Sequence, residues 1–132
     1  MSAPVTTSPD GREMTDTQYP HRTLPQLVAE AAGRYGERVA ITDGAVQLTY
    51  SELDAARRRA AAAFLAAGLE RGDRFAIWAP NMYQWIVAAI GAQSVGGVLV
   101  PLNTRYKGSE AAYAINASGA RMLFTVEEFL GV

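Results

Sequence analysis

Three short apolar runs recur at an even spacing along the second half of the chain, and this spacing constrains the fold more than any other feature. The runs begin at residues 75, 98 and 122, which puts them 23 and 24 residues apart. Repeated strand–helix–strand units produce such a pitch. Each run is apolar throughout, as is typical of parallel strands covered by helices on both faces. The chain is therefore expected to be an α/β protein with a parallel sheet and right-handed crossovers.

Helices are expected to connect the three runs. Asn81 and Gln84 are placed to cap the first, and Ser109 is placed to cap the second, which Gly119 ends. A further helix is expected to begin at Glu127–Leu130. The side chains expected to pack inward from the two connecting helices are Trp85, Ile86, Ala89, Ala92, Ala112, Tyr113 and Ile115.

The first half of the chain has two further helix starts. Thr23 with Gln26, and Thr49 with Glu52, have the three-residue spacing of a capping box. The helix after Thr49 is rich in alanine, notably at 60–63, and small side chains would let it lie close to the sheet. Glycines placed to end these two helices are Gly33 or Gly36 for the first and Gly68 for the second.

A small β-hairpin is expected between these two helices. Arg38–Thr42 and Ala45–Thr49 alternate between apolar and polar residues, and Asp43-Gly44 between them is a common two-residue turn. The side chains expected to share one buried face are Val39, Ile41, Val46 and Leu48. The predicted fold is thus a partial doubly wound parallel sheet with flanking helices and a hairpin.

Composition narrows the classes of function. The chain has no cysteine, one histidine (His21) and a net charge of −1, which argue against thiolate chemistry, histidine-based triads and nucleic acid as a partner. The cysteine-free composition suits a reducing cytoplasm. Phe75–Thr104 is long and almost uncharged, but internal Pro, Asn, Gln and Gly residues argue against a membrane span. Residues 1–22 are polar and are expected to be a disordered leader before a domain over 23–132.

Three motifs resemble binding or active-site signatures but lack residues or a context that those sites require. Gly91 and Gly96 have the spacing of a phosphate-binding loop, but no Lys or Ser/Thr follows and the order of helix and strand is reversed. Ala92–Gly96 resembles a nucleophile elbow around Ser94, without a base histidine. The basic run Arg57–Arg59 follows Asp54 at helical spacing, which favours a solvated helix face over an anion site.

Two loops keep two interpretations open. Pro101–Tyr106 follows the carboxyl end of a predicted parallel strand, where ligands bind in open α/β sheets. Asn103, Arg105 and Tyr106 in it could contact a ligand, or Asn103 and Arg105 could tie down the turn through hydrogen bonds, which is the favoured reading. The turn Ala79–Asn81 has the same ambiguity.

Several sequence blocks together resemble the beginning of the adenylate-forming enzymes, the family of the acyl-CoA synthetases. The blocks are Leu48–Leu53, Arg71–Arg74, Ala79–Asn81 and Gly96–Asn103, in family order. The resemblance runs from about Thr23 to the last residue. Within the family, the chain is similar to actinobacterial steroid-catabolic and fatty-acid CoA ligases.

The resemblance implies a two-step reaction. A carboxylate attacks the α-phosphate of Mg-bound ATP, which gives an acyl-adenylate and pyrophosphate, and the thiol of coenzyme A then displaces AMP. The family's phosphate loop, its magnesium-associated acidic residue and its catalytic lysine lie beyond residue 132. No catalytic, cofactor-binding or metal-binding residue is therefore assigned in this chain.

The expected function is that of an N-terminal fragment of an acyl-CoA ligase, inactive by itself. ATP, Mg and coenzyme A would serve the full-length enzyme, whose substrate would be a small carboxylic acid. The fragment is expected to expose an apolar face meant for the rest of the enzyme, and to be marginally stable. The alternatives are a freestanding α/β interaction module, or one half of a split ligase that acts with a partner chain.

Overall fold

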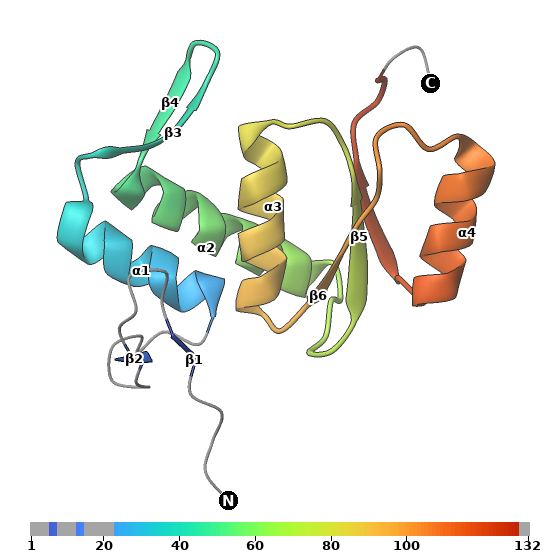
Figure 1. Cartoon of the computed structure of the whole chain (residues 1–132), viewed down its shortest axis with the longest axis horizontal. Coiled ribbons are helices and arrows are strands. Elements are labelled where there is room, and N and C mark those ends of the chain that lie inside the picture. Colours follow the sequence, from blue (N-terminus) through green and yellow to red (C-terminus); the bar gives the residue numbers. More distant parts are fainter. Residues whose placement is uncertain (1–5, 8–12, 15–22, 130–132) are drawn as a thin grey trace, which may run out of the picture.

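The computed structural model describes residues 6–7, 13–14 and 23–129 (Figure 1). The elements in chain order are β1 (Thr6–Thr7), β2 (Glu13–Met14), α1 (Leu24–Tyr35), β3 (Val39–Asp43), β4 (Val46–Thr49), α2 (Tyr50–Ala66), β5 (Arg74–Trp78), α3 (Tyr83–Ser94), β6 (Val98–Pro101), α4 (Gly108–Ser118) and β7 (Met122–Thr125). Strands β1 and β2 pair with each other. The remainder of the leader expected over 1–22 lies outside the described residues.

The predicted parallel sheet is confirmed. Its three strands lie in the order β6-β5-β7, and β5 pairs in parallel with both neighbours. Phe75, Ala76 and Ile77 of the central strand are completely buried. Phe75 and Ile77 belong to a core shared with α3, whereas Ala76 packs on the other face with Ala111 of α4. Helices α3 and α4 therefore cover opposite faces of the sheet (Figure 1).

The small side chains of α2 serve helix–helix packing. A Cβ atom placed on Gly91 of α3 would lie 2.5 Å from the Cβ atom of Ala60, which is too close for a side chain. The close approach of the two helix backbones therefore requires glycine at residue 91. The expectation that the alanines bring α2 onto the sheet is correct only at its carboxyl end, where the rings of Phe64 and Phe75 lie 5.6 Å apart.

The hairpin forms with its turn one residue later than expected. Asp43 pairs with Val46, so the two-residue turn is Gly44-Ala45, and Gly44 takes a positive φ of 56°. Ile41 and Leu48 lie opposite each other and are half-buried. Val39 and Val46 are exposed, in contrast to the predicted buried face. The pairing is irregular between Val39 and Ile41, and Val46 pairs with Asp43 directly beside the turn.

The helix caps at α1 and α2 are as predicted. Thr23 Oγ1 accepts the N–H of Gln26, and Thr49 and Glu52 form a reciprocal capping box. Gly36 follows α1, and Gly68, with φ of 87°, follows α2.

The N-terminal caps predicted for α3 and α4 are wrong, whereas Gly119 ends α4 with a positive φ of 67° as predicted. Helix α3 begins after Met82. The N–H of Tyr83, its first residue, donates to Oδ2 of Asp43 in the hairpin at 2.9 Å. Helix α4 begins after Lys107, whose N–H donates to Glu110 at 2.8 Å, so Ser109 lies inside the helix. Asp43 and Tyr83 lie 40 residues apart, so no short sequence pattern could predict that one caps the helix of the other.

The inward faces differ in part from the predicted ones. In α3, Ala89 and Ala92 are buried as expected, but Ile86 is exposed. In α4, Ala111 is buried, whereas Tyr113 is 76% exposed. Ile115 packs inward as predicted, but Ala111 and Ala114 take the inward places expected for Ala112 and Tyr113. Residues 127–129 are not helical, so the helix expected at 127–130 does not form within its described part.

Candidate functional site

The carboxyl ends of the three parallel strands define one edge of the sheet, and this edge carries the candidate site. A cavity of about 350 Å³ opens there between the end of β5, the loop after β6 and the residues after β7. Thr125 Oγ1 donates to the carbonyl oxygen of Trp78 at 2.8 Å, which ties the ends of β7 and β5 together. The N–H of Leu102 donates to the carbonyl oxygen of Ile77, which ties the β6 loop to β5.

Asn103 builds the loop that forms one wall of this cavity. Its Oδ1 accepts the N–H of Arg105 at 2.9 Å, and its carbonyl oxygen accepts the N–H of Tyr106 and the indole N–H of Trp78. The reading of Asn103 as a turn residue is therefore confirmed. Arg105 ties down the turn through its main-chain N–H, whereas its guanidinium has no partner among the described residues.

The cavity combines positive charge with aromatic surface. Arg105 and Lys107 are exposed at it, and Glu127 is the acidic side chain in its lining. The aromatic residues that line it are Trp78, Tyr106 and Phe129. Cationic side chains pair with carboxylate or phosphate, and aromatic faces pack against flat rings. The edge can therefore receive a group that is anionic, planar or both.

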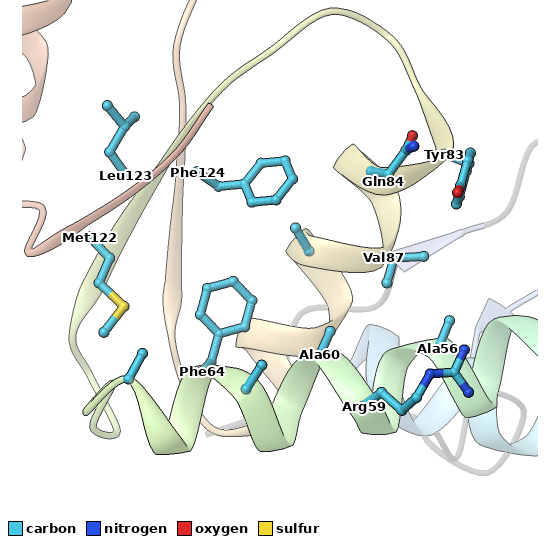
Figure 2. A pocket seen from close by; sticks show the side chains of 13 residues that line it. Ala56, Arg59, Ala60, Phe64, Tyr83, Gln84, Val87, Met122, Leu123 and Phe124 are labelled. Atoms are coloured by element: carbon cyan, nitrogen blue, oxygen red, sulfur yellow. The ribbon is translucent and has the colours of Figure 1, made fainter. Parts of the chain in front are cut away.

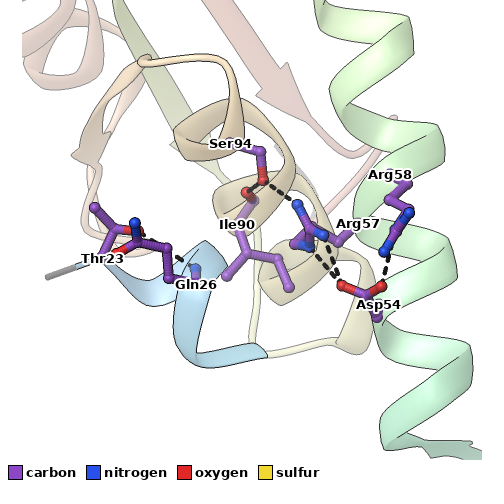
Figure 3. Close-up of polar contacts among 7 residues, drawn as sticks. All are labelled: Thr23, Gln26, Asp54, Arg57, Arg58, Ile90 and Ser94. Atoms are coloured by element: carbon purple, nitrogen blue, oxygen red, sulfur yellow. Dashed lines mark hydrogen bonds and ion pairs between the residues drawn. The ribbon is translucent and has the colours of Figure 1, made fainter. Parts of the chain in front are cut away.

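A second polar cluster lies between α2 and α3 (Figure 3). Asp54 is only 7% exposed, and its carboxylate accepts hydrogen bonds from Arg57, at 2.6 and 2.9 Å, and from Arg58, at 2.9 Å. Arg57 also donates to Oγ of Ser94 at 3.0 Å, which in turn donates to the carbonyl oxygen of Ile90. The prediction of a solvated face is wrong for Arg57, whose side chain is only 12% exposed and lies in the contact between the helices.

The arginines decide the ionisation of this carboxyl. Burial raises the pKa of Asp54, but the hydrogen bonds and charges of Arg57 and Arg58 outweigh it and hold the pKa below its ordinary value. Asp54 is thus a carboxylate with its hydrogen-bonding capacity occupied. We assign this cluster to the joining of α2 and α3, since the polar side chains of Asp54, Arg57 and Ser94 bond to one another or to the main chain.

An apolar groove of about 800 Å³ lies between α2, α3 and β7 (Figure 2). Phe64 and Phe124 turn toward it from two different elements (Figure 2). Among the other residues that line it are Ala60, Ala63, Val87 and Met122. The expectation that the chain would expose an apolar face agrees with this groove.

The two glycines that resemble part of a phosphate-binding loop have structural roles in the fold. Gly91 faces Ala60 in the contact between the helices, and Gly96, with φ of 86°, follows the carboxyl end of α3. Neither glycine lies at a helix N-terminus, where amide groups could hold a phosphate. Within residues 23–129, no group of three or more His, Asp or Glu side chains is arranged to hold a metal ion. No helix in the described part of the chain has the length and apolarity needed to cross a membrane.

Comparison with protein families identifies the family to which this chain belongs. The profile of the family described as "AMP-binding enzyme" matches residues 28–131, almost the whole described chain after α1 begins. This chain belongs to the AMP-binding enzyme family. The predicted resemblance to adenylate-forming enzymes is confirmed.

Curated relatives within the AMP-binding family are acyl-CoA ligases. The chain is 39% identical over 109 residues to the 3-[(3aS,4S,7aS)-7a-methyl-1,5-dioxo-octahydro-1H-inden-4-yl]propanoyl:CoA ligase of Rhodococcus jostii, a match that covers 83% of this chain and 21% of the relative. It is 38% identical to the ligase of the same name from Mycobacterium tuberculosis, of which it covers 22%. The chain therefore spans about a fifth of the length of these relatives.

The fold is also that of AMP-binding enzymes of known structure. The N-terminal subdomain of Klebsiella oxytoca NpsA superimposes with a TM-score of 0.78 at 25% identity, over 83% of this chain and 29% of that one. The predicted fold class, a partial α/β sheet with flanking helices and a hairpin, is thereby confirmed.

Sequence reasoning found the strand-end loop and missed two other features. The rule that ligands meet the carboxyl ends of parallel strands pointed to Arg105 and Tyr106. It missed Lys107, Glu127 and Phe129, which reach the same cavity from segments outside that loop. The groove was expected only as an unlocated apolar face, because its walls come from segments up to 68 residues apart, from Ala56 to Phe124.

Proposed function

We propose that this chain forms the N-terminal lobe of an ATP-dependent acyl-CoA ligase. The reaction would join a carboxylate to AMP, with release of pyrophosphate, and then transfer the acyl group to the thiol of coenzyme A with release of AMP. The observation that carries this proposal is the 39% identity to a CoA ligase over nearly the whole folded part of the chain. The match in fold to an N-terminal subdomain supports the same assignment.

The residues present here do not fit the Mg–ATP part of the reaction. Transfer of an adenylyl group needs donors for the phosphates and a cation for their charge. The described residues supply neither a phosphate-binding loop nor a group of metal ligands. We therefore assign no step of adenylate formation to this lobe, and we propose that the chain by itself is inactive.

The contribution of this lobe would be the edge of the sheet. In open α/β sheets, ligands bind outside the carboxyl ends of the strands. Arg105, Lys107 and Trp78 surround the cavity at this edge, and a substrate or cofactor of a CoA ligase carries anionic and planar groups that suit it. The lobe would bind and orient such a group while the chemistry takes place on residues elsewhere in the enzyme.

The acid substrate that we propose is a propanoate side chain on a fused bicyclic ring system derived from steroid breakdown. The names of the relatives from Rhodococcus jostii and Mycobacterium tuberculosis support this choice. A cytoplasmic location, where ATP and coenzyme A are available, is part of the same proposal. Cell fractionation would test the location.

A chimeric enzyme would test the function. The chain would replace the matching segment of the Rhodococcus jostii ligase, and AMP release would be measured with coenzyme A and a panel of carboxylic acids. Thioester formation with the bicyclic propanoate, and weaker activity with straight-chain acids, is the expected result. A folded chimera that releases no AMP with any acid would contradict the proposal.

The free chain supplies the complementary measurement. Exchange of labelled pyrophosphate into ATP should be undetectable with the 132-residue chain at any acid concentration. Measurable exchange would show that the chain alone activates carboxylates, and would refute its assignment as an inactive lobe.

A further inference from the structure

We propose that Trp78 is a positioning residue of this lobe. Its indole N–H holds the turn after β6 in place, and the turn in that place presents the guanidinium of Arg105 to a phosphate or carboxylate group of a substrate. This inference rests on the proposed function, since it takes the cavity at the edge of the sheet to bind a substrate of the ligase. It adds to that function a residue that acts through its charged neighbour.

The turn at residues 103–106 closes on the carbonyl oxygen of Asn103. The N–H of Tyr106 donates to this oxygen at 3.0 Å, which is the hydrogen bond between the first and fourth residues of a β-turn. Oδ1 of Asn103 accepts the N–H of Arg105 at 2.9 Å. Arg105 is the third residue of the turn, and its exposed side chain lines the cavity. The position of the turn therefore decides where the guanidinium lies.

The indole of Trp78 anchors this turn to the central strand of the sheet. Its Nε1 donates at 3.1 Å to the carbonyl oxygen of Asn103, which lies 25 residues further along the chain. Within residues 23–129, no other side chain from outside the turn forms a hydrogen bond with residues 103–106. The indole is thus the polar contact that fixes the turn relative to β5.

Trp78 is itself held firmly enough to act as an anchor. Its carbonyl oxygen accepts the hydroxyl of Thr125 at 2.8 Å, and the two residues lie opposite each other in the pairing of β5 with β7. Its ring packs against the core that contains Ala76, Leu102 and Ala111. Functional side chains keep their geometry when packing and hydrogen bonds lock the residues that support them. Trp78 meets this condition, since both its main chain and its ring have partners.

Arg105 is the group that benefits from a fixed turn. Within the described residues its guanidinium has no hydrogen-bond or ion-pair partner, although Glu127 lines the same cavity. An arginine binds carboxylate or phosphate through two parallel N–H groups, so the contact depends on the direction of the side chain. A turn that moves would spread the guanidinium over many positions. Ordering it on a ligand would then cost more conformational entropy.

The indole N–H can be removed with little disturbance of the sheet. Trp78→Phe keeps an aromatic ring against the same core, and the carbonyl oxygen of Asn103 keeps the N–H of Tyr106. Trp85→Phe is the matched control. Trp85 also packs on the core, and its indole has no hydrogen-bond partner in the described part of the chain.

Steady-state kinetics would test the positioning role in the chimera with the Rhodococcus jostii ligase. Both variants would be made alone and combined with Arg105→Gln, and KM would be measured separately for ATP, coenzyme A and the bicyclic propanoate. We expect Trp78→Phe to raise one of these KM values about fivefold or more, with a change in kcat of less than about twofold. Trp85→Phe should change neither constant by more than about twofold. The substrate affected identifies the source of the anionic group.

The double variant shows whether Trp78 acts through Arg105. Arg105→Gln should raise the same KM at least as much as Trp78→Phe does, and Trp78→Phe added to it should raise that KM by less than about twofold more. A full additional rise would overturn the proposal, because Trp78 would then act independently of Arg105. So would an equal rise in all three KM values, a fall in kcat alone, or equal effects of Trp78→Phe and Trp85→Phe.

Amide hydrogen exchange separates the failure of this proposal from that of the proposed function. Peptides of the chimera that cover residues 102–107 should exchange at least about tenfold faster after Trp78→Phe and at an unchanged rate after Trp85→Phe. Unchanged exchange after Trp78→Phe would overturn the anchor, whether or not the chimera forms thioester. Faster exchange in a chimera that forms no thioester would support the anchor and contradict the function alone.

Discussion

At the scale of single residues, the carboxylate of Asp54 holds two arginine side chains of α2 in place. It contacts Arg57 and Arg58, and Arg57 carries the contact across to Ser94 of α3. Removing one partner of a buried ion pair leaves the other charge buried and unpaired. This lowers the free energy of unfolding far more than the loss of a pair at the surface does.

Asp54→Ala should therefore destabilise the chain strongly. We expect the free energy of unfolding in urea to fall by about 3 kcal/mol, because the guanidinium of Arg57 stays buried without its carboxylate. Arg34→Ala is the matched control, since it removes an exposed guanidinium that pairs with Glu30 at the surface and should cost less than about 1 kcal/mol. Equal effects of the two substitutions would show that Asp54 is not an anchor.

The same carboxyl should make stability depend on pH. The pKa of Asp54 is lower in the folded chain than its ordinary value of 3.8, so its contribution is present above about pH 4 and is lost as the pH falls through the folded pKa. Urea unfolding between pH 2 and 6 should show stability falling on the acid side, with a smaller fall in Asp54→Ala. Some slope should remain, because the pKa of Asp73 is lowered by the N–H of Glu70 and by Arg121. An unchanged slope would contradict this assignment.

At the scale of the elements, two long-range contacts set how the helices begin and how closely they pack. Asp43 of the hairpin accepts the N–H of Tyr83 and so caps α3 from 40 residues away. Gly91 lets α3 approach Ala60 of α2. Each contact can be tested with a variant and a control taken from this chain.

Asp43→Ala should destabilise α3 through the loss of its cap. The expected loss is about 1 kcal/mol in the free energy of unfolding, as for other helix caps. Asn81→Ala, at the residue that the sequence favoured as the cap, should change stability by less than about 0.5 kcal/mol. Chemical denaturation of both variants checks this prediction, and the reverse order would restore the cap to Asn81.

Gly91→Ala should push α2 and α3 apart. The added Cβ would meet Ala60 at 2.5 Å, and we expect a loss of about 1–3 kcal/mol from overpacking. Gly33→Ala is the control, since nothing lies within 4 Å of a Cβ there and the helix should gain about 0.5–1 kcal/mol. Addition of Ala60→Gly to Gly91→Ala should recover most of the loss. A stabilising Gly91→Ala would show that the helices are not in tight contact.

Local rules predicted most of the secondary structure and fewer of the contacts. The N-cap at Thr23 and the capping box at Thr49 lie within four residues of sequence, and the strand at 74–78 is marked by its own apolar run. The cap of α3 and the burial of Arg57 involve residues 40 and 37 positions apart. No short window contains both partners of such a contact, so the sequence pattern alone could not reveal them.

At the scale of the whole molecule, residues 23–129 expose an apolar groove, and no described strand pairs with the outer edge of β7. Each Å² of apolar surface that stays exposed forfeits about 25 cal/mol of stabilisation. A stability of about 5–15 kcal/mol is ordinary for a whole domain, so a lobe of this kind should be marginal.

The free chain should accordingly unfold at a low temperature. We expect a broad transition below about 60 °C in calorimetry, or self-association through the exposed groove. The chimera with the remaining ligase sequence should melt cooperatively and at a higher temperature. A monomeric free chain with a cooperative transition above about 60 °C would contradict the view that this surface needs a partner.

The amino-acid sequence by itself determined the four helices and three parallel strands within residues 23–129 and the family to which the chain belongs, although it also predicted a helix at 127–130 that does not form in the described part. These properties depend on caps, glycines and apolar runs that act over a few neighbouring residues. Only the tertiary structure decided which face of α4 packs inward, which side chains surround the cavity at Arg105, and where the groove lies. Those properties depend on the positions of several elements at once, because burial is set by whichever side chains the folded chain brings into contact.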